Sequence, residues 1–251
     1  MIRFDVLTLF PQMFDAPLNE SVLKRAQERG KITIAIHNIR DFGVGRHRVV
    51  DDTPFGGGGG MVMKPEPIVQ AIESIKKRHA LTRVLLMTPQ GAVLDSDHVR
   101  RLAGYSHLVL VCGRYEGVDE RVRLGFVDEE ISIGDYVLTG GELAAMVLVD
   151  AVSRQIEGVL GHENAAHEDS FSQGLLEYPQ YTKPRSFRGV RVPEVLISGN
   201  HQEIRRWRRR ASIRRTWLRR PELLKKAALS PEDLRVISEW EQEGESCRET
   251  A

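Results

Sequence analysis

Two glycine-bearing turns carry the residues best suited to binding a ligand. Residues 113–117 (GRYEG) and 133–141 (IGDYVLTGG) each follow an apolar, strand-like run. In open α/β sheets, ligands bind beyond the carboxyl ends of the strands. Glycine lets the backbone approach a flat ligand closely, and Ile133, Tyr136 and Leu138 can enclose a ring. The residues alone fit an adenine held by backbone hydrogen bonds and fit two ordinary loops equally well.

Two charged residues further along the chain could take part in acid–base chemistry. Arg154 lies near the end of an apolar helical run, where a cation at a helix C-terminus is the simpler interpretation. Asp169 lies in a polar stretch, where a solvated loop carboxylate is the simpler interpretation. His162 and His167 match no strong metal-ligand spacing, so no metal site is expected.

Arginine and tryptophan are interleaved in the C-terminal part of the chain. Residues 183–226 contain 15 Lys and Arg against 3 Glu, whereas residues 115–177 contain 14 Asp and Glu against 3 Arg. A basic block predicts a polyanionic partner, because arginine makes forked contacts to phosphate. Trp207 and Trp217 could stack on bases, although tryptophan in a small helical domain is more often a core residue. A nucleic-acid surface is favoured over a set of solvated helices.

Five consecutive glycines at residues 56–60 could cradle a phosphate with their backbone amides. They lack the Lys-Ser/Thr of a P-loop and the spacing of a dinucleotide-binding turn. A hinge or lid without a fixed ligand is equally consistent with them.

Strands that alternate with helices must position these turns. Apolar or alternating runs predict strands at 2–10, 32–39, 84–87, 108–112 and 127–132, with a turn at 88–91. Helical spacing predicts helices at 19–30, 65–79, 96–103, 119–124, 142–156, 201–218, 221–228 and 231–243. The first of these is expected to be capped near Asn19, and the third at Ser96. The pattern indicates an α/β domain with a mostly parallel sheet, followed by a helical region. The polar stretch between 158 and 172 is the expected linker.

Composition excludes several classes of protein. The chain has 251 residues and a hydrophobic fraction of 41%, enough for one large domain or two ordinary ones. Its apolar runs are too short to span a membrane, and its start lacks the order of a signal peptide. Two cysteines make no disulfide framework. We expect a cytoplasmic protein without a membrane partner.

Taken together, these residues resemble the bacterial tRNA (guanine-N1)-methyltransferases, knotted enzymes of the SPOUT class that modify guanosine 37 beside the anticodon. The resemblance covers nearly the whole chain. The matching motifs are FDVLTLFP (4–11), DTPFGGGGGM (52–61), GRYEGVDER (113–121), SIGDYVLTGGE (132–142), DSF (169–171), YTKP (181–184) and VLISGNH (195–201). One departure is Lys183, where the family usually has arginine; lysine keeps the charge but loses the forked geometry.

The resemblance implies a SPOUT-type parallel sheet with a deep trefoil knot in residues 1–160, a flexible linker at 161–175 and a small all-helical tRNA-binding domain at 176–251. It implies a homodimer with shared active sites, S-adenosylmethionine as methyl donor and assistance from Mg²⁺, for which the sequence offers no ligand set. Asp169 is implied as catalytic base and Arg154 as the essential arginine. Ser170, Arg208 and Arg215 are assigned to tRNA. The implied cofactor residues are Pro89, Gly113, Tyr115, Glu116, Ile133, Gly134, Asp135, Tyr136, Val137, Leu138, Gly140 and Gly141.

Two other classes of protein stay open at this point. One is a nucleotide-dependent transferase that binds phosphate with residues 56–60. The other is an RNA-binding protein without catalysis, in which Asp169 is idle.

Overall fold

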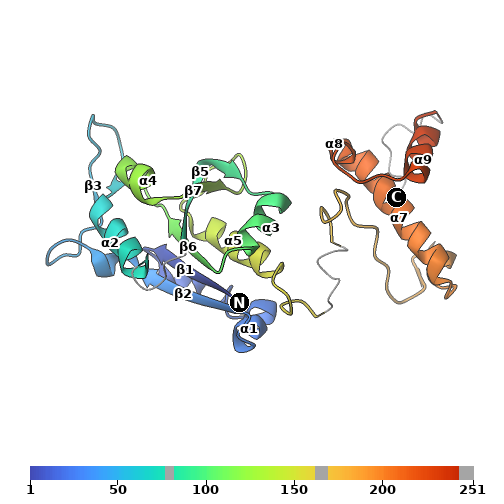
Figure 1. Cartoon of the computed structure of the whole chain (residues 1–251), viewed down its shortest axis with the longest axis horizontal. Helices are drawn as coiled ribbons and strands as arrows, with labels where there is room; N and C mark the ends of the chain where they lie inside the picture. The colour runs from blue at the N-terminus through green and yellow to red at the C-terminus, as the bar shows by residue number, and fades with distance from the viewer. Residues whose placement is uncertain (77–81, 162–168, 243–251) are drawn as a thin grey trace. The chain divides into compact units, whose positions relative to one another are not determined.

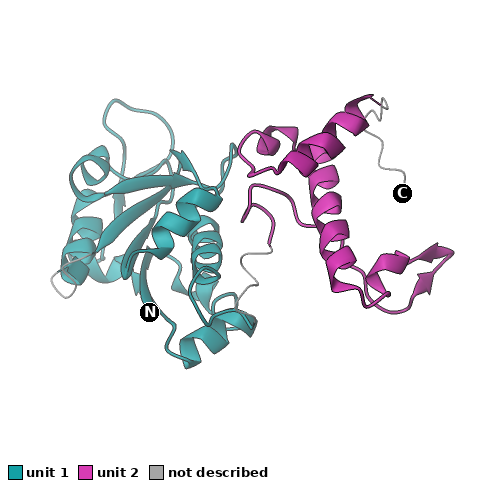
Figure 2. Ribbon diagram, turned by 45° about the vertical axis from the view of Figure 1, so that its right-hand side comes forward, with its two compact units in different colours: residues 1–163 teal, residues 164–251 magenta. Residues whose placement is uncertain are grey.

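The chain divides into two compact units, Met1–Glu163 and Asn164–Ala251 (Figure 2). The computed structural model describes residues 1–76, 82–161 and 169–242. The boundary falls within the polar stretch that the sequence marks as a linker. Outside the described residues lie residues 162–168 of that linker and Cys247. The same is true of the ends predicted for the helices at 65–79 and 231–243.

A five-stranded sheet forms the centre of the first unit. Its strand order is β2-β1-β6-β5-β7, and every neighbouring pair is parallel. The expected α/β domain with a parallel sheet is therefore confirmed. The strands are β1 (Ile2–Thr8), β2 (Ile32–Asn38), β5 (Arg83–Val93), β6 (His107–Cys112) and β7 (Glu129–Ser132).

Helices cover both faces of this sheet (Figure 1). One face is covered by α1 (Ser21–Glu28), α3 (Ser96–Ala103) and α5 (Glu142–Ser153), and the other by α2 (Pro65–Lys76) and α4 (Glu120–Phe126). The short elements of this unit are the 3-10 helices η1 (Pro11–Phe14) and η2 (Ile39–Phe42) and the paired strands β3 (Asp51–Asp52) and β4 (Val62–Met63).

Strand β6 shows why an uninterrupted apolar run suits this position. Leu108, Leu110 and Cys112 lie in the core on one face of the sheet, and Val109 and Val111 lie in the core on the other. Successive side chains of a strand point to opposite faces, so a strand covered on both sides needs apolar residues throughout.

The prediction for β5 was wrong at its end. Residues 88–91, expected as a turn, belong to a strand that continues to Val93. Its pairing with β7 shifts register between Met87 and Ala92, which accommodates Pro89 as an irregularity in the ladder. Gly91 is required there, because a Cβ at this position would lie 2.4 Å from the backbone of Glu130.

Two predicted helix caps were also wrong. Helix α1 begins at Ser21, and its N-cap residue Glu20 makes no side-chain capping bond. Helix α3 is capped by Asp95, whose carboxylate accepts hydrogen bonds from the backbone of Asp97 and His98. Aspartate is a preferred N-cap residue, so the cap lies one position before the serine that we expected.

The second unit is built around α7 (His201–Arg219), with α8 (Pro221–Leu224), α9 (Pro231–Gln242) and the 3-10 helix η3 (Glu194–Leu196). It is not all-helical, because β8 (Ser186–Phe187) and β9 (Val190–Arg191) pair as an antiparallel hairpin. Its core is formed by Leu175, Ile213 and Trp240. None of the described helices is long and apolar enough to cross a membrane.

Candidate functional site

Three strands of the first unit open onto one pocket of about 380 Å³. Met87 of β5 pairs with Cys112, the last residue of β6, and with Ile131 near the end of β7. The loops that follow β6 and β7 therefore leave the sheet at the same edge. Of the predicted cofactor residues, those that line the pocket are Pro89, Gly113, Tyr115, Glu116, Ile133, Gly134, Tyr136, Val137, Leu138, Gly140 and Gly141; Asp135 does not line it.

The two loops are joined directly to each other. The backbone N–H of Gly141 donates to the carbonyl of Gly113 at 2.9 Å, and Arg114 and Gly140 form a β-bridge. A Cβ on Gly141 would lie 2.8 Å from the Cα atom of Cys112, so only glycine permits this approach. The sequence motif thus serves loop-to-loop packing at the pocket wall.

The buried carboxylate of Glu142 stabilises this junction. Oε2 of Glu142 lies 2.9 Å from Nε of Arg114, and Oε1 accepts a 2.8 Å hydrogen bond from the hydroxyl of Thr8. Nη1 of Arg114 donates to the carbonyl of Thr139. Sequence reasoning missed this network. The available signal was a glutamate that opens an otherwise apolar helix.

Cys112 lies next to this network and is fully buried. Burial, together with the negative charge of Glu142, raises the pKa of its thiol well above the ordinary value. The thiol is therefore protonated at neutral pH, and Cys112 is a core residue rather than a nucleophile.

The loop after β7 folds on itself. Gly134 has a φ of +149°, and a Cβ there would lie 2.5 Å from the ring of Tyr136. The hydroxyl of Tyr136 donates to the carbonyl of Ile133, and the hydroxyl of Ser132 donates to the carbonyl of Gly134. These bonds fix a short loop in which Ile133, Gly134, Tyr136, Val137 and Leu138 line the pocket.

The glycine run ends against the loop after β6. The backbone N–H of Glu116 donates to the carbonyl of Met61, and that of Met63 donates to the carbonyl of Gly117. A Cβ on Gly60 would lie 2.4 Å from Oε1 of Glu116. Gly60 thus allows close packing against a pocket carboxylate.

The predicted catalytic residues belong to different units. Arg154 is the C-cap residue of α5 in the first unit and does not line the pocket. Asp169 belongs to the second unit, where its carbonyl accepts hydrogen bonds from the backbone and hydroxyl of Ser172. The hydroxyl of Ser170 accepts from the backbone N–H of Glu177. The catalytic roles of Arg154 and Asp169 stay predictions.

No group of three or more His, Cys, Asp or Glu side chains able to hold a metal ion occurs within the described parts of the chain. His162 and His167, considered above for such a role, lie outside those parts. Magnesium therefore has no assigned ligand here.

Two arginines predicted to contact tRNA lie on α7. The guanidinium of Arg208 lies 4.7 Å from the ring centroid of Tyr178, and Arg215 donates to the carbonyl of Glu177. The tryptophans differ in role. Trp217 packs on the core, 5.8 Å from Trp240, which confirms the core interpretation for that residue. Trp207 instead lines a pocket of this unit.

Fold and pocket define a class of α/β protein that has a pocket at its strand ends and carries a second, basic unit. Residues 2–226 match the family described as tRNA (Guanine-1)-methyltransferase TrmD. A tRNA (guanine-N(1)-)-methyltransferase of Geobacter sulfurreducens is 60% identical over 244 residues, which cover 97% of this chain and 100% of that protein. A protein of the same name from Moorella thermoacetica is 58% identical, and the match covers 95% of this chain and 96% of that protein. Another from Dictyoglomus turgidum is 52% identical, and the match covers 97% of this chain and 98% of that protein. The chain belongs to the tRNA (guanine-N1)-methyltransferase family, and the resemblance seen in its motifs is confirmed.

Proposed function

We propose that this protein transfers the methyl group of S-adenosylmethionine to N1 of guanosine 37 in tRNA, next to the anticodon. The observation that carries the proposal is the junction of two glycine loops at the ends of β6 and β7, which forms a pocket from residues far apart in sequence. The family match supplies the reaction class. The basic second unit is suited to an RNA substrate.

The residues of the pocket fit this methyl donor. Ile133 and Leu138 offer apolar contacts for adenine, and the backbone of the same loop offers hydrogen bonds. Glu116 offers a carboxylate to the donor's ammonium group. The donor supplies an electrophilic methyl group, so the protein mainly has to orient it and exclude water.

The acceptor needs activation, because N1 of guanine carries a proton and is a poor nucleophile until that proton leaves. Asp169 accepts the proton as general base, a role worth about 10²–10⁴-fold in rate. Negative charge then develops on O6 of guanine, and Arg154 stabilises it or orients Asp169. Reaching N1 requires the base to leave its stack.

The proposal also covers the knot, the oligomeric state, the location in the cell and the requirement for Mg²⁺. The first unit carries a deep trefoil knot, and two copies of the chain form a homodimer in which each active site draws on both. The protein acts in the cytoplasm, where tRNA is modified. Mg²⁺ assists the reaction. Light scattering tests the dimer: twice the mass of the chain supports it, and the mass of one chain contradicts it. Addition of EDTA tests the metal: a fall in turnover supports a role for Mg²⁺, and an unchanged rate contradicts it.

Calorimetry with S-adenosylmethionine and with ATP tests the choice of donor. We expect saturable binding of S-adenosylmethionine and none of ATP; the reverse result would favour the nucleotide-dependent transferase. Steady-state transfer of labelled methyl to tRNA then tests the base. Asp169→Ala should bind the donor normally and lose most of kcat. Near wild-type kcat in that variant would show that Asp169 is not the base.

A further inference from the structure

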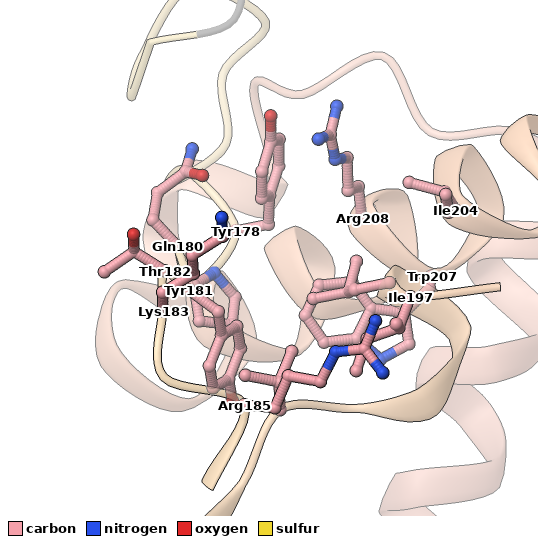
Figure 3. Close-up of a pocket in the computed structure, with 13 residues that line it drawn as sticks. Tyr178, Gln180, Tyr181, Thr182, Lys183, Arg185, Ile197, Ile204, Trp207 and Arg208 are labelled. Carbon is pink, nitrogen blue, oxygen red and sulfur yellow. The ribbon is translucent and has the colours of Figure 1, made fainter. Parts of the chain in front are cut away.

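The second unit contains a pocket of its own, with a volume of about 330 Å³ (Figure 3). It lies where the segment before the β8–β9 hairpin passes α7. Its size is at the lower end of the roughly 300–1,000 Å³ typical of small-ligand sites, so it suits a single small group. The methyl-transfer chemistry proposed above does not use it.

Aromatic rings form part of its wall. Tyr181 is 46% exposed, and its ring centroid lies 6.3 Å from that of Trp207 with an angle of 57° between the ring planes. Rings tilted in this way leave no parallel slot between them. A flat group therefore stacks on a free ring face rather than between the two rings.

The charged residues of this pocket are all basic. Lys183, Arg185 and Arg208 line it, and none of the described residues that line it carries a carboxylate. The Nε–H of Arg208 is buried and has no hydrogen-bond partner among the described residues. A buried N–H without a partner is costly, and a ligand acceptor in the pocket would satisfy it.

Aromatic rings beside basic side chains match the two halves of a nucleotide, its base and its phosphate. A base stacks on an aromatic face whatever its identity, and a phosphate pairs with lysine and arginine. A duplex fits poorly, because its bases are already stacked on one another and offer no free face to a ring. An acidic peptide would use the cations but not the rings.

We propose that this pocket binds one unstacked nucleotide of the substrate tRNA other than the target guanosine. The base stacks on the exposed ring of Tyr181, beside Trp207, and the phosphate is held by Lys183, Arg185 and Arg208. This rests on the proposed function for the choice of RNA. It makes Tyr181 and Trp207 substrate-binding residues, and it gives Lys183 a phosphate contact that needs a positive charge but no forked geometry.

Steady-state methyl transfer with the full chain tests the stack. Tyr181→Ala should raise KM for tRNA by about 5- to 150-fold, the range expected for loss of one base–aromatic stack, with unchanged affinity for S-adenosylmethionine. Tyr181→Phe keeps the ring and is the matched control, so its KM should stay near wild type. Equal KM values for wild type, Tyr181→Ala and Tyr181→Phe would overturn the proposal.

Fluorescence provides a readout that does not depend on catalysis. Titration with a short single-stranded RNA should quench tryptophan emission, and Trp207→Phe should remove most of that quenching while leaving the circular dichroism unchanged. Quenching that persists in Trp207→Phe, or that a blunt RNA duplex produces equally, would overturn the stacking role. If wild type binds the single strand in this way but methylates no tRNA, the proposed function fails and the pocket assignment stands.

Discussion

The Nε atom of Arg114 lies 2.9 Å from Oε2 of Glu142, and this ion pair joins the loop after β6 to the first residue of α5. The side chain of Glu142 is 1% exposed and that of Arg114 is 15% exposed. Because Thr8 bonds to the same carboxylate, β1 is tied to the junction as well. One buried carboxylate therefore holds the two loops that form the proposed donor pocket.

Replacing that carboxylate should affect both folding and donor binding. In Glu142→Gln the Arg114 charge loses its partner, which should lower the free energy of unfolding by about 3 kcal/mol, the lower end of the range for breaking a buried pair. The affinity for S-adenosylmethionine should fall with it. Denaturant unfolding and calorimetry measure the two effects.

An exposed ion pair of the same unit supplies the control. Asp97 pairs with Arg100 on α3, with side chains 73% and 44% exposed. Asp97→Asn should change stability by less than about 1 kcal/mol and leave donor affinity unchanged. Equal losses in Glu142→Gln and Asp97→Asn would contradict the structural role of the buried pair.

Gly140 should tolerate no side chain. A Cβ there would lie 2.3 Å from Nε of Arg114 and 2.6 Å from Oε2 of Glu142, so Gly140→Ala must separate the pair. We expect at least a tenfold loss of S-adenosylmethionine affinity by calorimetry. Gly59→Ala is the matched control, because a Cβ at Gly59 meets nothing within 4 Å. A Gly140→Ala protein that binds the donor as wild type does would refute this account of the junction.

Much of the first unit could be predicted because its strands are covered on both sides. The run at β6 is apolar at every position, and only a buried parallel strand or a short buried helix explains such a run. The turn predicted at 88–91 was wrong for a physical reason. Pro89 and Gly91 are turn residues in most contexts, but here tertiary pairing with β7 draws them into a strand.

The pocket itself could be predicted only in part. Its two loops were identified from glycine and aromatic content, but their contact depends on β5 lying between β6 and β7, a pairing order that local patterns do not encode. The same holds for Trp207 and Trp217. Both are surrounded by arginines in sequence, and only helix packing decides that Trp217 meets Trp240 while Trp207 meets Tyr181.

The buried carboxylate of Asp5 in β1 predicts that the free energy of unfolding falls in acid. Burial alone would raise the pKa of Asp5, but hydrogen bonds from His107, His37 and Arg3 outweigh it and hold the pKa well below its usual range. The stabilisation is therefore complete above the unfolded-state pKa of about 3.9 and is lost as pH falls below it.

Asp5→Asn should lower the free energy of unfolding at pH 7 by about 1.5–3 kcal/mol, as expected for loss of hydrogen bonds to a charged group. The difference from wild type should shrink as pH falls below about 4. Urea unfolding of both proteins across that range measures it. A difference that stays constant with pH would mean that the ionised carboxylate is not the stabilising species.

Charge reversal on α7 should weaken tRNA binding selectively. Arg208→Glu and Arg215→Glu each remove a proposed phosphate contact, so tRNA affinity and the steepness of its salt dependence should fall. Affinity for S-adenosylmethionine should not change. Arg29→Glu, an exposed reversal in the first unit, controls for net charge. Loss of donor affinity in the α7 variants would indicate misfolding or another RNA footprint.

The central claim is methylation of one atom of one nucleotide, and nucleoside mass spectrometry tests it directly. Two tRNA transcripts that differ only in guanosine or adenosine at position 37 are incubated with the protein and S-adenosylmethionine. We expect 1-methylguanosine in the first transcript at one equivalent and no methylated nucleoside in the second. No methylation of the first transcript, or equal methylation of both, would contradict the proposed function.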